Sequence, residues 1–141
     1  MKLLAALIIA LGVFVTPEEG WTLFAKTKFK SKYFKEQDEH FLVPSFDQLL
    51  LSKRGGEIQI KGHYMPIDMK GNSLILSRYP YSSCFFCGGA GPESVAEIVL
   101  KDKKPKLKAD QVITVKGRLR LNESDINHLN FVLEEAEIVP N

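Results

Sequence analysis

The chain has only two cysteines among its 141 residues, Cys84 and Cys87, and therefore no second Cys-x-x-Cys pair. A four-cysteine zinc site of the kind found in zinc ribbons is excluded. The sequence also lacks a Ser-His-Asp arrangement, a glycine-rich phosphate loop and a spaced pair of carboxylates from which an active site could be built. These absences favour a binding or accessory protein over an enzyme.

A strong excess of one charge is absent as well. The 19 Lys and Arg residues stand against 17 Asp and Glu residues, which leaves a formal net charge of +2. Composition therefore does not indicate a nucleic-acid-binding protein. The length suits one domain with a hydrophobic core and is too short for two domains of ordinary size.

Apolar runs long enough to cross a membrane are missing too. The longest run, 3–15, follows Lys2 as the apolar segment of an export signal does. As a helix it would extend about 20 Å, short of the roughly 30 Å hydrocarbon core. We predict a signal peptide over residues 1–20, with an uncleaved anchor or a buried helix as alternatives. The protein is thus expected in the periplasm, or membrane-anchored and facing outside the cytoplasm.

Residues 21–40 are rich in lysine and irregular in pattern. Lysines recur at every second position and would share one side of an extended chain: Lys26, Lys28, Lys30 and Lys32. One interpretation is a basic arm that lies on anionic lipid headgroups or another polyanion. The other is a solvated tether between the signal and a folded domain at 41–141.

Within 41–141, alternating apolar and polar residues predict a sheet. A short helix comes first, with a capping box at Ser45 and Gln48 and an exit at Gly55-Gly56. Segment 112–121 alternates most strictly. Strands are expected at 58–65, 73–79, 95–100, 112–121 and 131–139, with a short helix as the competitor for 95–100.

The first and fourth of these strands share a glycine at a core-facing position, Gly62 and Gly117. A glycine there costs stability and is expected where a strand coils sharply to close a small barrel. Five strands with such glycines resemble the OB-fold. We predict an all-β, OB-like Greek-key barrel with a short leading helix.

The Cys84-x-x-Cys87 pair, followed by Gly88-Gly89, can bring two thiolates to one ion. We predict a transition-metal site, zinc first, at Cys84 and Cys87 with His63 as a third ligand. Thiol–disulfide redox chemistry is one alternative, although the helix that usually follows a redox pair is missing. A local disulfide or two inert thiols is another. His40 and His128 are expected to be solvated.

A second candidate site lies on the outward face of the strands. Its basic residues are Lys61, Lys116, Arg118 and Arg120, and the aromatic residues near the cysteines are Tyr79, Tyr81, Phe85 and Phe86. Aromatic and basic residues on OB barrels bind single strands by stacking and charge. Because an exported protein seldom meets nucleic acid, an anionic oligomer or lipid surface is the expected ligand. In the alternative, the rings pack over the barrel end and shield the cysteines.

The run Cys84-Phe85-Phe86-Cys87-Gly88-Gly89-Ala90-Gly91-Pro92-Glu93-Ser94 resembles a group of small exported bacterial proteins of unknown function with OB-like barrels. The resemblance covers roughly residues 41–139 and implies a fold but no activity. We therefore expect an exported, non-catalytic binding or accessory module. Its expected partner is another exported protein or an anionic membrane surface.

Overall fold

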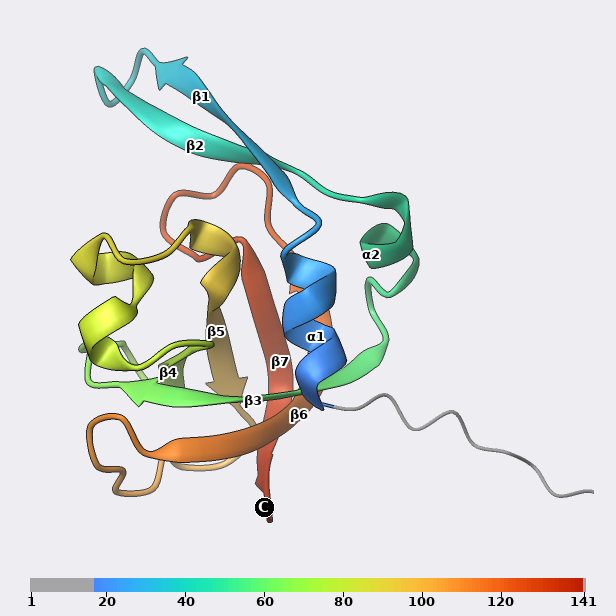
Figure 1. The fold of residues 1–141 in the computed structure, drawn as a ribbon, viewed down its shortest axis with the longest axis vertical. Helices are drawn as coiled ribbons and strands as arrows, with labels where there is room; N and C mark the ends of the chain where they lie inside the picture. The colour runs from blue at the N-terminus through green and yellow to red at the C-terminus, as the bar shows by residue number, and fades with distance from the viewer. Residues whose placement is uncertain (1–16, 141) are drawn as a thin grey trace, which may run out of the picture.

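The computed structural model describes residues 17–140, which fold around a closed barrel of five strands (Figure 1). The barrel strands are β3 (Glu57–Met65), β4 (Ser73–Ser77), β5 (Val95–Leu100), β6 (Val112–Leu121) and β7 (Phe131–Val139). Their order is β3-β4-β5-β7-β6, and β6 closes onto β3. Neighbouring strands are antiparallel except β5 and β7, which run parallel. This Greek-key order confirms the predicted OB-like barrel.

Strand β5 is the barrel strand that positions the candidate site, and it confirms the strand predicted for residues 95–100 over the competing short helix. Its side chains alternate between two buried faces, since Ala96 and Ile98 belong to the main core while Val95 and Glu97 face the other way. Two loops cover this outer face. The β4–β5 loop (78–94) contacts Val95, and the β6–β7 loop (122–130) hydrogen bonds to Glu97.

Gly62 and Gly117 occupy positions where the barrel leaves no room for a side chain. A Cβ at Gly62 would lie 2.6 Å from the Ser77 carbonyl oxygen and 3.1 Å from the Trp21 ring. A Cβ at Gly117 would lie 3.0 Å from the Ala136 Cβ, where the β6–β7 register shifts. Both glycines therefore permit the close approach of chain segments that a small closed barrel requires.

Helix α1 (Pro17–Phe24) lies against β3 and belongs to the folded unit. Trp21 and Phe24 are buried, and the Trp21 indole donates a 2.7 Å hydrogen bond to the Lys61 carbonyl. The Phe24 ring stacks on Phe131, with centroids 4.3 Å apart. These contacts correct the expected domain start at residue 41. The apolar run 3–15 lies outside the described residues, and no helix within 17–140 is long and apolar enough to span a bilayer.

Residues 21–40 also contain the first strand of a hairpin, which corrects the expected irregular tether. Strands β1 (Lys28–Phe34) and β2 (Glu39–Ser45) pair antiparallel and extend alongside one end of the barrel (Figure 1). The next element is α2 (Gln48–Ser52), whose N-cap is Asp47 instead of the expected Ser45. The Asp47 carboxylate accepts a 3.1 Å hydrogen bond from the backbone N–H of Leu49, and Ser45 ends β2.

Candidate functional site

The two cysteines lie in the β4–β5 loop, which is built from three short 3-10 turns: η1 (Tyr81–Ser83), η2 (Phe85–Cys87) and η3 (Pro92–Ser94). The Cys84 carbonyl accepts hydrogen bonds from the backbone N–H groups of Cys87 (3.2 Å) and Gly89 (3.1 Å). Gly88 has a positive φ of 77°, and a Cβ at Gly89 would lie 2.8 Å from the Ser83 backbone. The two glycines thus fold the chain back so that both cysteines stand on one side of the turn.

The thiols form a reduced pair with Sγ atoms 3.6 Å apart. Two sulfur ligands bound at about 2.3 Å to one ion would be that far apart at an S–metal–S angle of roughly 100°, close to tetrahedral. Cys84 is fully buried and Cys87 is exposed. The pair is thus arranged as two neighbouring ligands, one fixed in the protein and one open to solvent.

The acidity of the exposed thiol opposes a thioredoxin-like reaction. The hydrogen bond with Cys84 raises the pKa of Cys87, and desolvation and the charge of Cys84 raise it further. A redox nucleophile needs the opposite shift, which an adjoining helix N-terminus or a cation usually supplies. Here Cys87 ends a three-residue 3-10 turn.

Cys84 packs into a small apolar cluster separate from the main core. Its buried neighbours are Met65, Ile75 and Val95, and the partly buried members are Ile67, Met69, Phe85 and Leu129. Of the aromatic residues near the motif, Phe85 packs in this way, while Tyr79, Tyr81 and Phe86 are exposed. One ring therefore shields the buried thiol as the packing alternative expects, and the others lie at the surface.

His63, the expected third ligand, is engaged elsewhere. Its Nδ1 lies 3.3 Å from the Asp110 carbonyl oxygen and 4.0 Å from the Asp110 carboxylate. That carboxylate also accepts a 2.7 Å hydrogen bond from the backbone N–H of Tyr81, at the start of the cysteine loop. Within residues 17–140, no three His, Cys, Asp or Glu residues are grouped so that they could hold a metal. In the described part of the chain, the two thiols are therefore not joined by a third His, Asp or Glu ligand.

A buried acid and a histidine meet beside the cysteine loop, which the sequence patterns did not reveal. Glu97 is 2% exposed, and its carboxylate oxygens lie 2.9 and 3.2 Å from His128 Nδ1. The backbone N–H of Leu129 donates to the same carboxylate at 3.1 Å. His128 is thus exposed to solvent, as predicted, but its ring also contacts a buried carboxylate, which was not predicted. The one available signal was an acidic residue inside the otherwise apolar segment 95–100.

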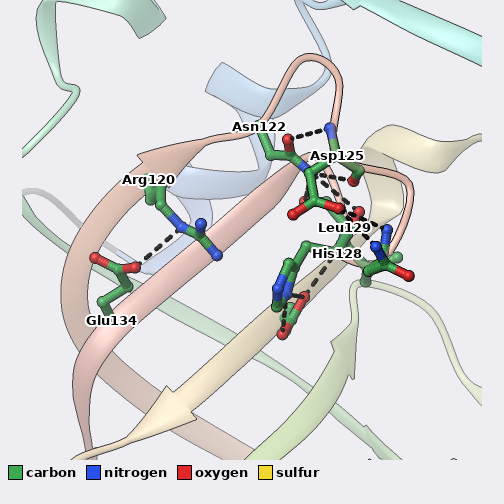
Figure 2. Close-up of polar contacts among 8 residues, drawn as sticks. Arg120, Asn122, Asp125, His128, Leu129 and Glu134 are labelled. Atoms are coloured by element: carbon green, nitrogen blue, oxygen red, sulfur yellow. Dashed lines mark hydrogen bonds and ion pairs between the residues drawn. The ribbon is translucent and has the colours of Figure 1, made fainter.

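Asn122 organises the β6–β7 loop (Figure 2). Its side-chain amide donates to the carbonyls of Asp125 (2.7 Å), His128 (3.1 Å) and Leu129 (3.2 Å). Its Oδ1 accepts from the backbone N–H groups of Ser124 and Asp125. One buried side chain therefore fixes the loop that carries His128.

A cleft of about 360 Å³ opens between the β1–β2 hairpin, the cysteine loop and the β6–β7 loop. Apolar side chains dominate its walls, and His40 and His128 contribute the ring nitrogens. The apolar lining residues include Phe34, Phe41, Leu42, Phe85, Ile126 and Leu129. Because hydrogen bonds to Glu97 engage Nδ1 of His128, its Nε2 is the ring nitrogen available to a ligand.

The four basic residues expected to bind an anion do not form a uniformly positive surface. Arg118 lies 3.4 Å from the Glu134 carboxylate, and Arg120 lies 3.0 Å from the same group (Figure 2). Lys116 lies opposite Glu137 in the β6–β7 register, while Lys61 is exposed on β3 opposite Thr114. Carboxylates of β7 thus compensate much of the charge, which weakens the case for an anionic ligand on this face.

No family model, curated protein or solved structure matches the chain. The resemblance of the Cys84–Ser94 motif to small exported bacterial proteins therefore stays a prediction. The function of the protein therefore depends on what the chemistry of its own residues supports.

Proposed function

We propose that this protein is an exported, non-catalytic binding module in which Cys84 and Cys87 together hold one transition-metal ion. The observation that carries the proposal is the 3.6 Å separation of the two reduced Sγ atoms. Backbone hydrogen bonds to the Cys84 carbonyl hold the loop in this geometry, so the chain itself keeps the two ligands together. Preformed ligand geometry reduces the ordering cost of binding.

The different exposures of the two thiols suit reversible loading. Buried Cys84 is held by its apolar neighbours, whereas exposed Cys87 gives an ion a path from solvent. Zinc, the ion favoured by the spacing, normally takes four ligands in structural sites. The two thiols would supply half of that shell, so water or an exported partner protein would supply the rest.

The proposal is tested on the full-length chain, reduced under nitrogen and loaded separately with zinc, cobalt(II) or copper(I). After desalting, we expect one metal ion per chain with at least one of these ions, and thiolate-to-cobalt absorption if cobalt binds. Cys87→Ser is the matched control because the residue is exposed and its loss should leave the circular dichroism spectrum unchanged. The proposal fails if the native chain retains none of the three ions, or if the variant retains them equally well.

The cleft supports a second candidate, the binding of a small, mostly apolar ligand. Buried Glu97 orients the His128 ring, and an apolar cleft with few convergent polar groups is the usual form of a small-molecule site. An NMR screen of small aromatic fragments should shift the signals of His128 and Phe85 in the native chain. A screen in which no fragment shifts these signals would end this candidate, and so would equal shifts of the Phe85 signals in the native chain and in His128→Ala.

A further inference from the structure

The cysteines stand among the other sulfur-containing side chains that the structure describes. The chain has two cysteines and three methionines, and apart from Met1, which lies outside residues 17–140, all of them belong to the cysteine loop or the cluster beneath it. Met65 is fully buried at the end of β3, and Met69 is partly buried in the β3–β4 connection. Both pack in the cluster that contains Cys84. Strand β3 and the β3–β4 connection therefore bring two thioethers into the cluster of Cys84, whose Sγ lies 3.6 Å from that of Cys87.

This combination of ligand atoms discriminates among metals. Thiolate and thioether sulfur together are soft ligands that favour copper(I), whereas a structural zinc site needs four ligands drawn from thiolate, imidazole and carboxylate groups. Within the described residues no imidazole or carboxylate joins the thiols to form a group of three. The groups that do pack around Cys84 are apolar or thioether, and a hydrophobic shell limits the access of water to a bound ion.

We propose that the site selects copper(I), with Cys84 and Cys87 as thiolate ligands and a thioether of Met65 or Met69 completing the shell. This inference rests on the proposed metal-binding function and names its ion. On binding, two S–H bonds are replaced by two S–Cu bonds, and two protons pass to solvent. Copper and sulfur keep their oxidation states, so no oxidant or reductant is consumed.

The experiment is a competition on the reduced full-length chain under nitrogen. Copper(I) is titrated in the presence of bathocuproine disulfonate, which reports free copper(I) by its colour, and a parallel titration measures zinc. We expect one copper(I) per chain and displacement of bound zinc by an equal amount of copper(I). Met65→Leu, Met69→Leu and the double variant test the thioethers, because leucine closely matches methionine in volume.

At least one single variant and the double variant should bind copper(I) about 10-fold more weakly or worse, while any zinc affinity changes less than about 2-fold. Equal copper(I) affinity in the native chain and the double variant would overturn the thioether assignment. Zinc that resists displacement by copper(I) would overturn the selectivity. Either result leaves the proposed metal-binding function intact, whereas a native chain that binds none of copper(I), zinc and cobalt(II) overturns both proposals. Thermal unfolding of each variant, measured alongside, excludes misfolding as the cause of weaker binding.

Discussion

The two loops that cover the outer face of β5 are held in place by different means. The β6–β7 loop is held by the Asn122 amide, which bonds to backbone groups of the loop, and by Glu97 of β5, which contacts His128 and the Leu129 N–H. In the cysteine loop, backbone hydrogen bonds and close glycine packing set the shape. The Asn122 side chain is committed to the structure of the first loop, whereas the two thiols of the second loop stand next to each other with one of them exposed. The contrast separates a loop held by polar side chains from a loop held by its backbone.

The contrast predicts its largest effect at Asn122. Asn122→Ala should lower the free energy of unfolding by about 2–4 kcal/mol, because it leaves several backbone groups of the loop without partners. Chemical denaturation of the two proteins measures the difference. Asn127→Ala, an exposed amide in the same loop, is the matched control and should cost about 0.5 kcal/mol or less. Equal costs for the two variants would contradict the supporting role assigned to Asn122.

Substitutions of the two cysteines should have different effects on the stability of the protein but the same effect on metal binding. Cys84→Ser should lower the free energy of unfolding by about 1–3 kcal/mol, because it places a hydroxyl in an apolar cluster. Cys87→Ser should leave stability unchanged within the error of denaturant titration, since Cys87 is exposed. Both substitutions should weaken metal binding, because each removes one of the two neighbouring sulfur ligands. A Cys87→Ser variant that unfolds as readily as Cys84→Ser would show that the exposed thiol also holds the loop.

A smaller effect is expected where the cysteine loop packs on itself. A Cβ at Gly89 would lie 2.8 Å from the Ser83 backbone, so Gly89→Ala should shift the turn that carries Cys87. We expect metal affinity to fall about 10-fold, in the range found when groups supporting metal ligands are removed. Gly71→Ala is the control for backbone strain without crowding, because Gly71 has a positive φ and a Cβ there meets nothing within 4 Å. The same loss of metal affinity in both variants would contradict the view that close packing at Gly89 positions Cys87 for metal binding.

The smallest effect concerns pH and the β6–β7 loop. The backbone amide of Asn127, followed by its side chain, lowers the pKa of Asp125. A carboxylate with a lowered folded pKa stabilises the protein above its unfolded pKa of about 3.9, and this contribution disappears as pH falls through the folded value. Asp125→Asn should therefore weaken the loss of stability on acidification, as measured by denaturation between about pH 2 and 5. Parallel curves for the two proteins would contradict this linkage.

The barrel could be predicted from the sequence because its strands alternate over long segments and its two tight positions are marked by Gly62 and Gly117. The N-terminal part could not. Helix α1 is short and adjoins a signal-like run, so burial of Trp21 and Phe24 against distant strands has no local signature. The lysine-rich strand β1 is mostly exposed, so its pattern resembles that of a tether.

In the candidate site, too, contacts between residues close in sequence could be predicted, whereas contacts between distant residues could not. The Cys-x-x-Cys spacing and its glycines predict that two thiols come together, and the 3.6 Å separation confirms that proximity. The pairing of Glu97 with His128 joins residues 31 positions apart, and the approach of Met65 to Cys84 depends on strand packing. Such contacts follow from barrel register and loop path, which residue spacing does not encode. The expected role of His63 rested on residue type alone, and the structure pairs that residue with Asp110.

Joint binding of one ion by Cys84 and Cys87 is tested most directly by X-ray absorption at the metal edge. The sample is the reduced full-length chain loaded with one equivalent of copper(I), compared with Cys87→Ser under the same conditions. We predict a sulfur-only first shell with at least two sulfur atoms at about 2.3 Å in the native chain, and the loss of one of them in the variant. A first shell of nitrogen and oxygen, or identical spectra for the two proteins, would contradict binding by the thiol pair.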